Sequence, residues 1–183
     1  MDLLDGIESR TSALKLTEPA PSREQLQRII AAGTRAPDHG RLRPWRFIVL
    51  EGDARRQLGD AMAAMLLAKM PGASPEQLDS ERRKPLRAPA IVVAAAHITK
   101  GKIPEMEQVL AVGAAVQNMM LAAYSLGYGA MWKTGGAAYD ARTKQLLGLA
   151  PEDHVVAFLY LGTVGAAGPV VPAPLDDSVL RWL

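Results

Sequence analysis

The longest stretch of the sequence without a charged side chain runs from Gln108 to Trp132, and it constrains the fold more than any other feature. Such a stretch could cross a membrane, but Gln117 and Asn118 stand together at its middle. Its alanines and glycines lower the mean hydropathy, and the Gly127-Tyr128-Gly129 turn cuts it to about the minimum spanning length. We therefore predict no membrane span, and instead a buried helix at the centre of a soluble fold or dimer.

Length and composition favour one domain covering residues 1–183. The chain is 49% hydrophobic and 22% charged, so it has enough apolar residues to form a core without disulfides or a structural metal. It has no cysteine, which excludes disulfides, thiolate zinc sites, iron–sulfur clusters and a cysteine nucleophile. The three histidines, His39, His97 and His154, do not stand at metal-ligand spacing. We expect no metal.

The charge balance argues against a polyelectrolyte partner. Lysine and arginine number 21 against 19 acidic residues, and the N-terminus shows no charged-then-apolar leader. We expect a cytoplasmic protein that binds no nucleic acid. One alternative is a basic stripe of Arg35, Arg41, Arg43 and Arg46 around Trp45, which would give salt-dependent retention on DNA.

Apolar periodicity, capping residues and turn formers predict the elements. Helices are expected over residues 2–9, 22–36, 53–70, 74–84, 105–126 and 140–147, and strands over 46–51, 90–97, 128–133 and 154–162. Residues 165–174 contain only Gly, Ala, Val and Pro, so they should run extended. The chain then ends in Val179, Leu180, Trp182 and Leu183, which need a docking surface such as a second subunit.

Familiar catalytic motifs fail on this chain. The stretch from Gly127 to Thr134 nearly spells a phosphate loop, but Trp132 occupies the place of the second glycine and the helix precedes the strand. No catalytic triad, nucleophile elbow or pair of carboxylates can be placed. What remains is a set of turns that carry cations: Arg10 with Ser12, then 35–43, then Trp132-Lys133. Such turns suit an anionic, planar cofactor.

Four segments in this order resemble the FMN-dependent nitroreductase superfamily, in particular its short branch of NAD(P)H nitroreductases. They are Arg10-Thr11-Ser12, residues 35–39, residues 44–47 and residues 127–132. The resemblance covers essentially the whole chain. It implies an α+β, nitroreductase-like fold with a small, mostly antiparallel sheet flanked by helices. It also implies an intertwined homodimer in which each C-terminal arm, residues 165–183, docks on the partner.

The resemblance also implies the cofactor contacts. Arg10 and Ser12 correspond to the phosphate-binding pair, with Thr11 along the ribityl chain. Arg35 and His39 would reach the FMN bound mainly by the partner. Met131, Trp132 and Lys133 would line the isoalloxazine through backbone amides, and Lys133 would add positive charge for the reduced flavin. The alternative for each is a plain structural role: a helix-end cation for Arg10, a turn hydroxyl for Ser12, a solvated turn for Arg35 and His39, and an edge-strand Trp with a surface Lys for Trp132 and Lys133.

The chain departs from the larger relatives at several positions. Leu14, followed by Lys15, stands where they carry a basic residue against the pyrimidine, Gly40 and Arg41 replace an asparagine, and Arg181 is the one candidate for a basic C-terminal contact. Residues 121–126 correspond to a stretch assigned to the nicotinamide nucleotide, but their apolar character favours a core position. Arg82, Arg83, Lys84 and Arg87 are either a nucleotide contact or a solvated helix face.

The implied function is an FMN-dependent NAD(P)H oxidoreductase. Hydride would pass from NAD(P)H through flavin N5 to a small acceptor, a nitroaromatic or a quinone, in a ping-pong cycle. We expect no catalytic acid or base from the protein, because the chemistry belongs to the cofactor. The alternative is a dimer that binds or stores FMN without turnover.

Overall fold

The chain folds around a five-stranded antiparallel sheet. The computed structural model describes residues 2–171 and 175–183. The strands pair in the order β1-β5-β3-β2, and β4 pairs with β5. Their bounds are β1 (Ala13–Thr17), β2 (Trp45–Leu50), β3 (Ala90–Ala96), β4 (Gly129–Lys133) and β5 (His154–Ala167). The pairings β1·β5, β2·β3, β3·β5 and β4·β5 are all antiparallel, so the predicted α+β fold is confirmed.

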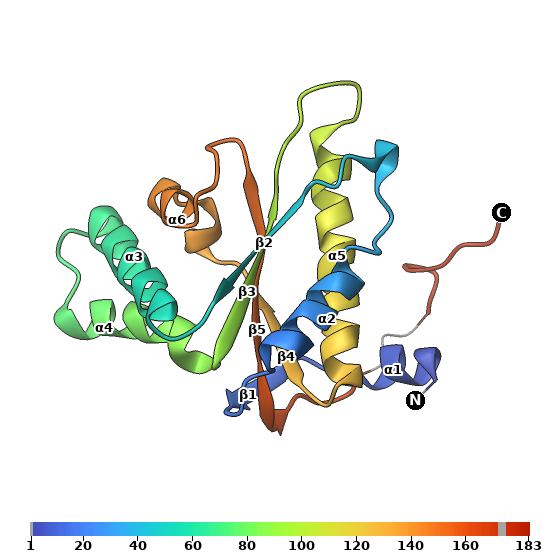
Figure 1. The fold of residues 1–183 in the computed structure, drawn as a ribbon, viewed down its shortest axis with the longest axis horizontal. Helices are drawn as coiled ribbons and strands as arrows, with labels where there is room; N and C mark the ends of the chain where they lie inside the picture. The colour runs from blue at the N-terminus through green and yellow to red at the C-terminus, as the bar shows by residue number, and fades with distance from the viewer. Residues whose placement is uncertain (1, 172–174) are drawn as a thin grey trace.

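Helices cover both faces of the sheet. Figure 1 shows α3, α4 and α6 on one face and α1, α2 and α5 on the other. Their bounds are α1 (Leu3–Ser9), α2 (Arg23–Gly33), α3 (Asp53–Lys69), α4 (Pro75–Arg83), α5 (Glu105–Ser125) and α6 (Ala141–Leu146). Each corresponds to a predicted helix. The capping boxes Ser22/Gln25 and Ser74/Gln77 open α2 and α4 as their spacing indicates.

The two-sided cover explains why β3 and β5 read as continuous apolar runs. Every residue of β3 is buried. Ile91 and Val93 pack with Leu58 of α3 on one face, and Val92 packs with Val116 of α5 on the other. A strand covered on both faces loses the alternation of a half-exposed strand.

Most of the uncharged stretch forms α5, which lies against the sheet through Val112, Val116 and Met119. On the side of α5 that faces away from the sheet, Met106 and Leu110 are 65% and 62% exposed. No helix among the described residues is long and apolar enough to cross a membrane. Residues 121–126 are partly core, since Ala123 is fully buried and its neighbours range from half-buried to exposed.

Two predictions about the sheet were incomplete. Strand β1 was not predicted, because its burial does not alternate and its register with β5 shifts on both sides of Lys15. Strand β5 continues to Ala167 instead of ending at residue 162, because β1 pairs with this extension. Residues 165–167 of the expected arm therefore belong to the sheet.

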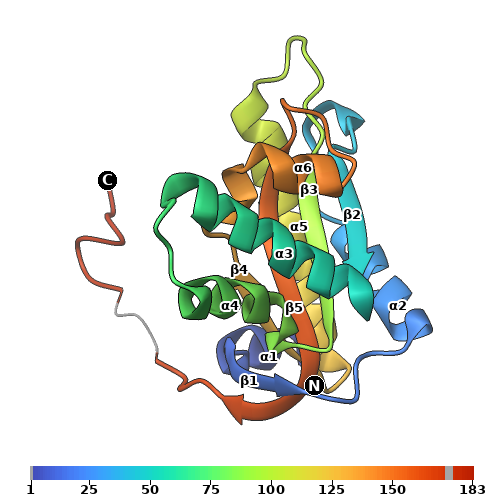
Figure 2. The same cartoon turned by 90° about the vertical axis from the view of Figure 1, so that its left-hand side faces the viewer.

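The rest of the C-terminal segment leaves the sheet. Of the stretch expected to run extended, residues 172–174 lie outside the described residues. Figures 1 and 2 show the C-terminus away from the body of the chain. Trp182 is 86% exposed, and Val179 and Leu183 are exposed with it. These apolar side chains therefore have no docking surface within the single chain.

Candidate functional site

Arg10 lies where α1 ends and β1 is about to begin, and its guanidinium is partly buried. Its backbone N–H caps α1 by donating to the Gly6 carbonyl at 3.2 Å. Its Nε and Nη1 are both buried without a hydrogen-bond partner in the structure. A buried cation with unmet donors is costly, so such a group points to a missing anion. Arg55 also has a buried Nε without a partner, but its Nη1 donates to the Ala88 carbonyl at 2.5 Å, so only Arg10 has two such donors.

A groove of about 810 Å³ opens beside Arg10. Thr11, Ser12 and Leu14 line it together with residues 168–171. Gly168 closes the groove through its N–H, which donates to the Ser12 carbonyl at 3.2 Å. A Cβ at Gly168 would lie 2.7 Å from that oxygen, so the close approach requires glycine. The predicted residues Arg10, Thr11 and Ser12 are thus together on one groove wall.

The Arg10 end of the site is continuous with β4. Arg10 and Thr11 line a narrow cleft with Tyr124 of α5 and with Gly129 and Ala130 of β4. Lys133 lies four residues beyond Gly129 on β4, which is about 13 Å at the rise of an extended strand. An elongated ligand anchored at Arg10 could therefore follow β4 toward Lys133.

A second cavity, of about 320 Å³, lies between the sheet and α3. We call it the α3 cavity. Its floor is a four-residue platform, because Met131 and Lys133 of β4 stand directly opposite Tyr160 and Phe158 of β5. Met62, Met65 and Leu66 of α3 form an apolar wall. Floor and wall together suit a flat, largely apolar ring.

The rim of the α3 cavity is basic. Lys69, Lys84, Arg87 and Lys133 face Glu81 as the one acidic lining residue. Lys84 pairs with Glu81, whereas no described residue forms an ion pair with Arg87. Burial raises the pKa of Tyr160 to about 12, against the opposing effect of the Arg87 charge. The cavity therefore favours a ligand with negative charge or carbonyl oxygens on its polar edge.

Trp132 points to the opposite face of the sheet from Met131 and Lys133. Its Nε1 donates to the Val156 carbonyl at 3.0 Å. A Cβ at Gly113 of α5 would lie 3.9 Å from the Trp132 ring, so the indole packs over α5. The Trp132 side chain therefore does not line the α3 cavity, and any contact with a ring there would come from its backbone.

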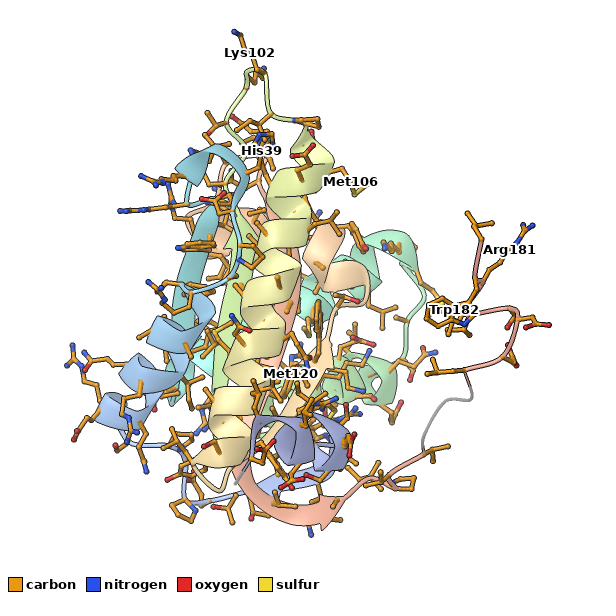
Figure 3. The ribbon with its side chains drawn as sticks, turned by 90° about the vertical axis from the view of Figure 1, so that its right-hand side faces the viewer. His39, Lys102, Met106, Met120, Arg181 and Trp182 are labelled. Atoms are coloured by element: carbon orange, nitrogen blue, oxygen red, sulfur yellow. The ribbon has the colours of Figure 1, made fainter. Side chains whose placement is uncertain are left out.

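His39 lies far from Arg10 in the same chain, and Arg35 stands on the exposed turn that leads to His39. His39, in the short helix η1 (His39–Arg41), places Nδ1 2.5 Å from Glu107 Oε2 near the start of α5. Arg10 lies beside Tyr124 near the end of α5, about 25 Å along the helix axis at 1.5 Å per residue. Figure 3 shows His39 and Met120 well apart along α5. One chain therefore does not bring His39 to Arg10.

Comparison with known proteins decides the family. Residues 7–163 match the Nitroreductase family. The chain belongs to this family. It is 38% identical over 164 residues to the Escherichia coli protein named "Putative NAD(P)H nitroreductase YdjA", covering 89% of this chain and 88% of that protein. A Haemophilus influenzae protein, "Putative NAD(P)H nitroreductase", is 36% identical over 165 residues, covering 89% of each chain.

Solved structures of this nitroreductase family share the fold. A nitroreductase-like protein from Bacillus cereus superposes with a TM-score of 0.84 at 24% identity, covering 100% of this chain and 96% of that one. A Bacteroides fragilis nitroreductase with bound FMN gives a TM-score of 0.75 at 18% identity, covering 100% and 99%. The nitroreductase-like fold expected from the sequence is thereby confirmed.

The residues of this nitroreductase-family chain fit FMN. The unmet donors of Arg10 match a phosphate, and the α3 cavity matches a ring with an apolar body and a polar edge. Lys15 and Arg181, the two uncertain candidates, line neither the groove nor the α3 cavity. Figure 3 shows Arg181 on the tail, away from the body of the chain.

Sequence reasoning missed several lining residues. The sequence grouped Lys84 and Arg87 with Arg82, but only Lys84 and Arg87 line the α3 cavity. Arg82 pairs with Asp60 and Asp79 outside the cavity, while Lys84 and Arg87 line it. Tyr160 was not singled out at all. The available signal was its hydroxyl, which is out of place in an otherwise apolar strand.

Proposed function

We propose that this chain is a homodimeric, FMN-dependent NAD(P)H oxidoreductase that reduces nitroaromatic or quinone-like acceptors. The observation that carries the proposal is the guanidinium of Arg10, whose Nε and Nη1 are buried without partners beside the open groove. The Escherichia coli relative named as an NAD(P)H nitroreductase and the FMN-bound Bacteroides fragilis structure support it.

Arg10, Thr11 and Ser12 would hold the phosphate and ribityl parts of FMN. The guanidinium offers two buried N–H donors, and charge-assisted hydrogen bonds to phosphate are strong at such a site. The Ser12 hydroxyl and the half-buried Thr11 lie on the same groove wall. Binding would relieve the cost of the unpaired cation, which is why the phosphate contributes selectivity as well as affinity.

Residues 131–133 and the α3 cavity would hold the isoalloxazine ring. When bound, FMN supplies the chemistry, accepting hydride from NAD(P)H and passing electrons to the acceptor. Met131 and Phe158 offer apolar contact, and the backbone of residues 131–133 offers amides along the exposed edge of β4. Lys133, Lys84 and Arg87 place positive charge where a reduced ring carries negative charge. No side chain is needed as an acid or base.

A second copy of the chain would complete the site. The exposed Met106 and Leu110 of α5 and the exposed apolar tail both require a cover that the single chain does not provide. Dimerisation through these surfaces would let the partner's arm dock. It would also carry the Arg35–His39 turn of one chain to the FMN held by the other.

The test begins with the purified protein and added FMN. We expect a yellow complex in a dimer by light scattering, and anaerobic stopped-flow should show rapid bleaching of the flavin by NADPH or NADH. Nitroaromatic and quinone acceptors should then restore the colour. A yellow dimer that no nicotinamide nucleotide bleaches would instead identify an FMN-storage protein. Protein that takes up no FMN and oxidises no NAD(P)H would refute the proposal.

A further inference from the structure

We propose that Tyr160 and Arg87 act as a pair that grips an oxygen of the ring bound in the α3 cavity and favours its negatively charged, reduced form. The inference deepens the proposed function and rests on it, because the ligand is the flavin ring. In this role both are positioning residues that tune the ring, and neither transfers a proton.

The first observation is that Tyr160 differs from the other tyrosines. The Tyr124 hydroxyl donates to Ser9 at 3.0 Å and the Tyr128 hydroxyl to Gln25 at 2.8 Å. Tyr139 is 77% exposed to solvent. Tyr160 is only 4% exposed, lines the α3 cavity, and has no hydrogen-bond partner among the described residues. The protein does not enclose the Tyr160 hydroxyl, which opens onto the cavity and can donate to a ligand there.

The second observation is the charge state of the Tyr160 hydroxyl. Burial raises its pKa to about 12, so the phenol keeps its proton at any physiological pH. A phenol that stays neutral remains a hydrogen-bond donor toward a carbonyl or an anion. It would not repel the negative charge that a reduced ring acquires.

The third observation is that Arg87 is a cation without a carboxylate partner on the same cavity. It lies in η2 (Lys84–Arg87), and its charge reaches Tyr160 strongly enough to oppose the rise in the phenol pKa. Its neighbours Arg82 and Lys84 are both paired with carboxylates. Arg87 is exposed and no described residue forms an ion pair with it, so its charge is available to a ligand that enters the cavity and covers it.

The surrounding structure fixes the positions of Tyr160 and Arg87 at the cavity. Tyr160 is held between Met131 on β4 and Ile91 on β3 in the middle of the sheet. Arg87 follows the buried Pro85 and precedes Ala88, whose carbonyl accepts from Arg55. A neutral donor and a cation fixed on one polar edge bind an anionic oxygen more tightly than a neutral one. The pair should therefore raise the reduction potential of the ring.

The variants Tyr160→Phe and Arg87→Gln test the pair in the FMN-loaded dimer. Tyr139→Phe and Arg83→Gln are the matched controls, since neither residue lines the cavity. The readout is the midpoint potential of bound FMN by dye equilibration, with the dissociation constant of oxidised FMN measured by fluorescence. We expect each cavity variant to weaken reduced FMN relative to oxidised FMN about tenfold, a fall of about 30 mV for a two-electron couple. The controls should match the wild type.

The possible outcomes separate the inference from the proposed function. Wild-type protein that binds no FMN would overturn both. Wild-type protein that binds FMN, with Tyr160→Phe and Arg87→Gln at the wild-type potential, would overturn the inference alone. Arg87→Lys provides a second check if Arg87→Gln fails to fold. This variant keeps the positive charge but loses the planar guanidinium. The midpoint potential of its bound FMN should therefore lie between those of the wild type and Tyr160→Phe. A wild-type potential would contradict the proposed role of Arg87.

Discussion

Arg10 and the Arg35–His39 turn carry similar chemistry but stand in opposite physical situations. Two nitrogens of the Arg10 guanidinium are buried with no partner, and one chain supplies the lining residues of its groove. Arg35 and His39 are exposed, and His39 already pairs with Glu107. Under the proposed function, the chain would prepare the Arg10 half of the site itself and the partner would supply the Arg35–His39 half.

The difference has an energetic consequence. A buried cation without a partner destabilises the empty protein, and an anion that satisfies it gains from low dielectric and strong hydrogen bonds. An exposed arginine or histidine is screened by water and salt, and it contributes little until another surface covers it. The two halves should therefore respond very differently to substitution.

The largest expected effect is at Arg10. We expect Arg10→Met to weaken FMN binding about 300-fold, or ~3 kcal/mol, because two buried charged hydrogen bonds are lost. The melting temperature of the empty protein should stay the same or rise, because methionine keeps the apolar stem and removes the unmet donors. Calorimetric titration and scanning calorimetry measure the two quantities. Unchanged FMN affinity would remove Arg10 from the site.

The α3 cavity should also exclude water, and the stability of the protein at alkaline pH tests this through Tyr160. Its pKa is raised from 10.0 to about 12, so below pH 10 the phenol is protonated in both the folded and unfolded states. Between pH 10 and 12 the unfolded chain releases this proton and the folded chain retains it. The free energy of unfolding should therefore fall with rising pH, by about 2 to 3 kcal/mol from this group.

Denaturant unfolding of the wild type, Tyr160→Phe and Tyr139→Phe across this pH range measures that contribution. Tyr160→Phe should lose less stability between pH 10 and 12 than the wild type does. Tyr139→Phe should follow the wild type, because Tyr139 lies in solvent. Parallel curves for all three proteins would show that the α3 cavity does not exclude water.

Packing of α3 on α4 should hold the wall of the prepared cavity. A Cβ at Gly59 of α3 would lie 2.3 Å from the Arg82 carbonyl of α4, too close for any side chain. We expect Gly59→Ala to lower the free energy of unfolding by about 2 kcal/mol, measured in urea. Gly72→Ala is the control, since it has open space around it, and it should be neutral. Equal stabilities would mean that α4 moves freely.

The smallest expected effect is at the exposed turn. His39→Ala should weaken FMN binding about fivefold, or ~1 kcal/mol, because a solvent-exposed contact contributes little to the binding free energy. The loss should shrink with added salt if the contact is electrostatic. A fluorescence titration at two salt concentrations measures both. An effect as large as that of Arg10→Met would contradict the division between the two halves.

The sequence predicted most of the architecture because apolar periodicity and capping act locally. All six helices and four of the five strands follow from such patterns. Strand β1 was missed because its bulged register carries no alternation, and the end of β5 was missed because only β1 makes it a strand. These elements depend on partners distant in the chain.

The site divides in the same way. Arg10 and Ser12, or Met131 and Lys133, are close in sequence, and the structure places each set on one wall. Tyr160 and Arg87 line one cavity only because η2 packs beside α3, and no local pattern predicts that. The side-chain direction of Trp132 follows from strand alternation, once the face occupied by Met131 is known.

Hybrid dimers test most directly whether two chains share each FMN. One hybrid joins an Arg10→Met chain to a His39→Ala chain, co-expressed with different affinity tags and purified on both. If the two residues serve one FMN from different chains, both lesions fall in the same site and the other site is intact. This hybrid should then bind one FMN per dimer with wild-type affinity.

The matched control joins a wild-type chain to one that carries both substitutions, which should leave no intact site. Calorimetric titration of the two hybrids gives both stoichiometry and affinity. The account predicts one wild-type site in the first hybrid and none in the control. The reverse result, with the wild-type site in the control hybrid alone, would show that Arg10 and His39 of the same chain act together and would contradict the shared site.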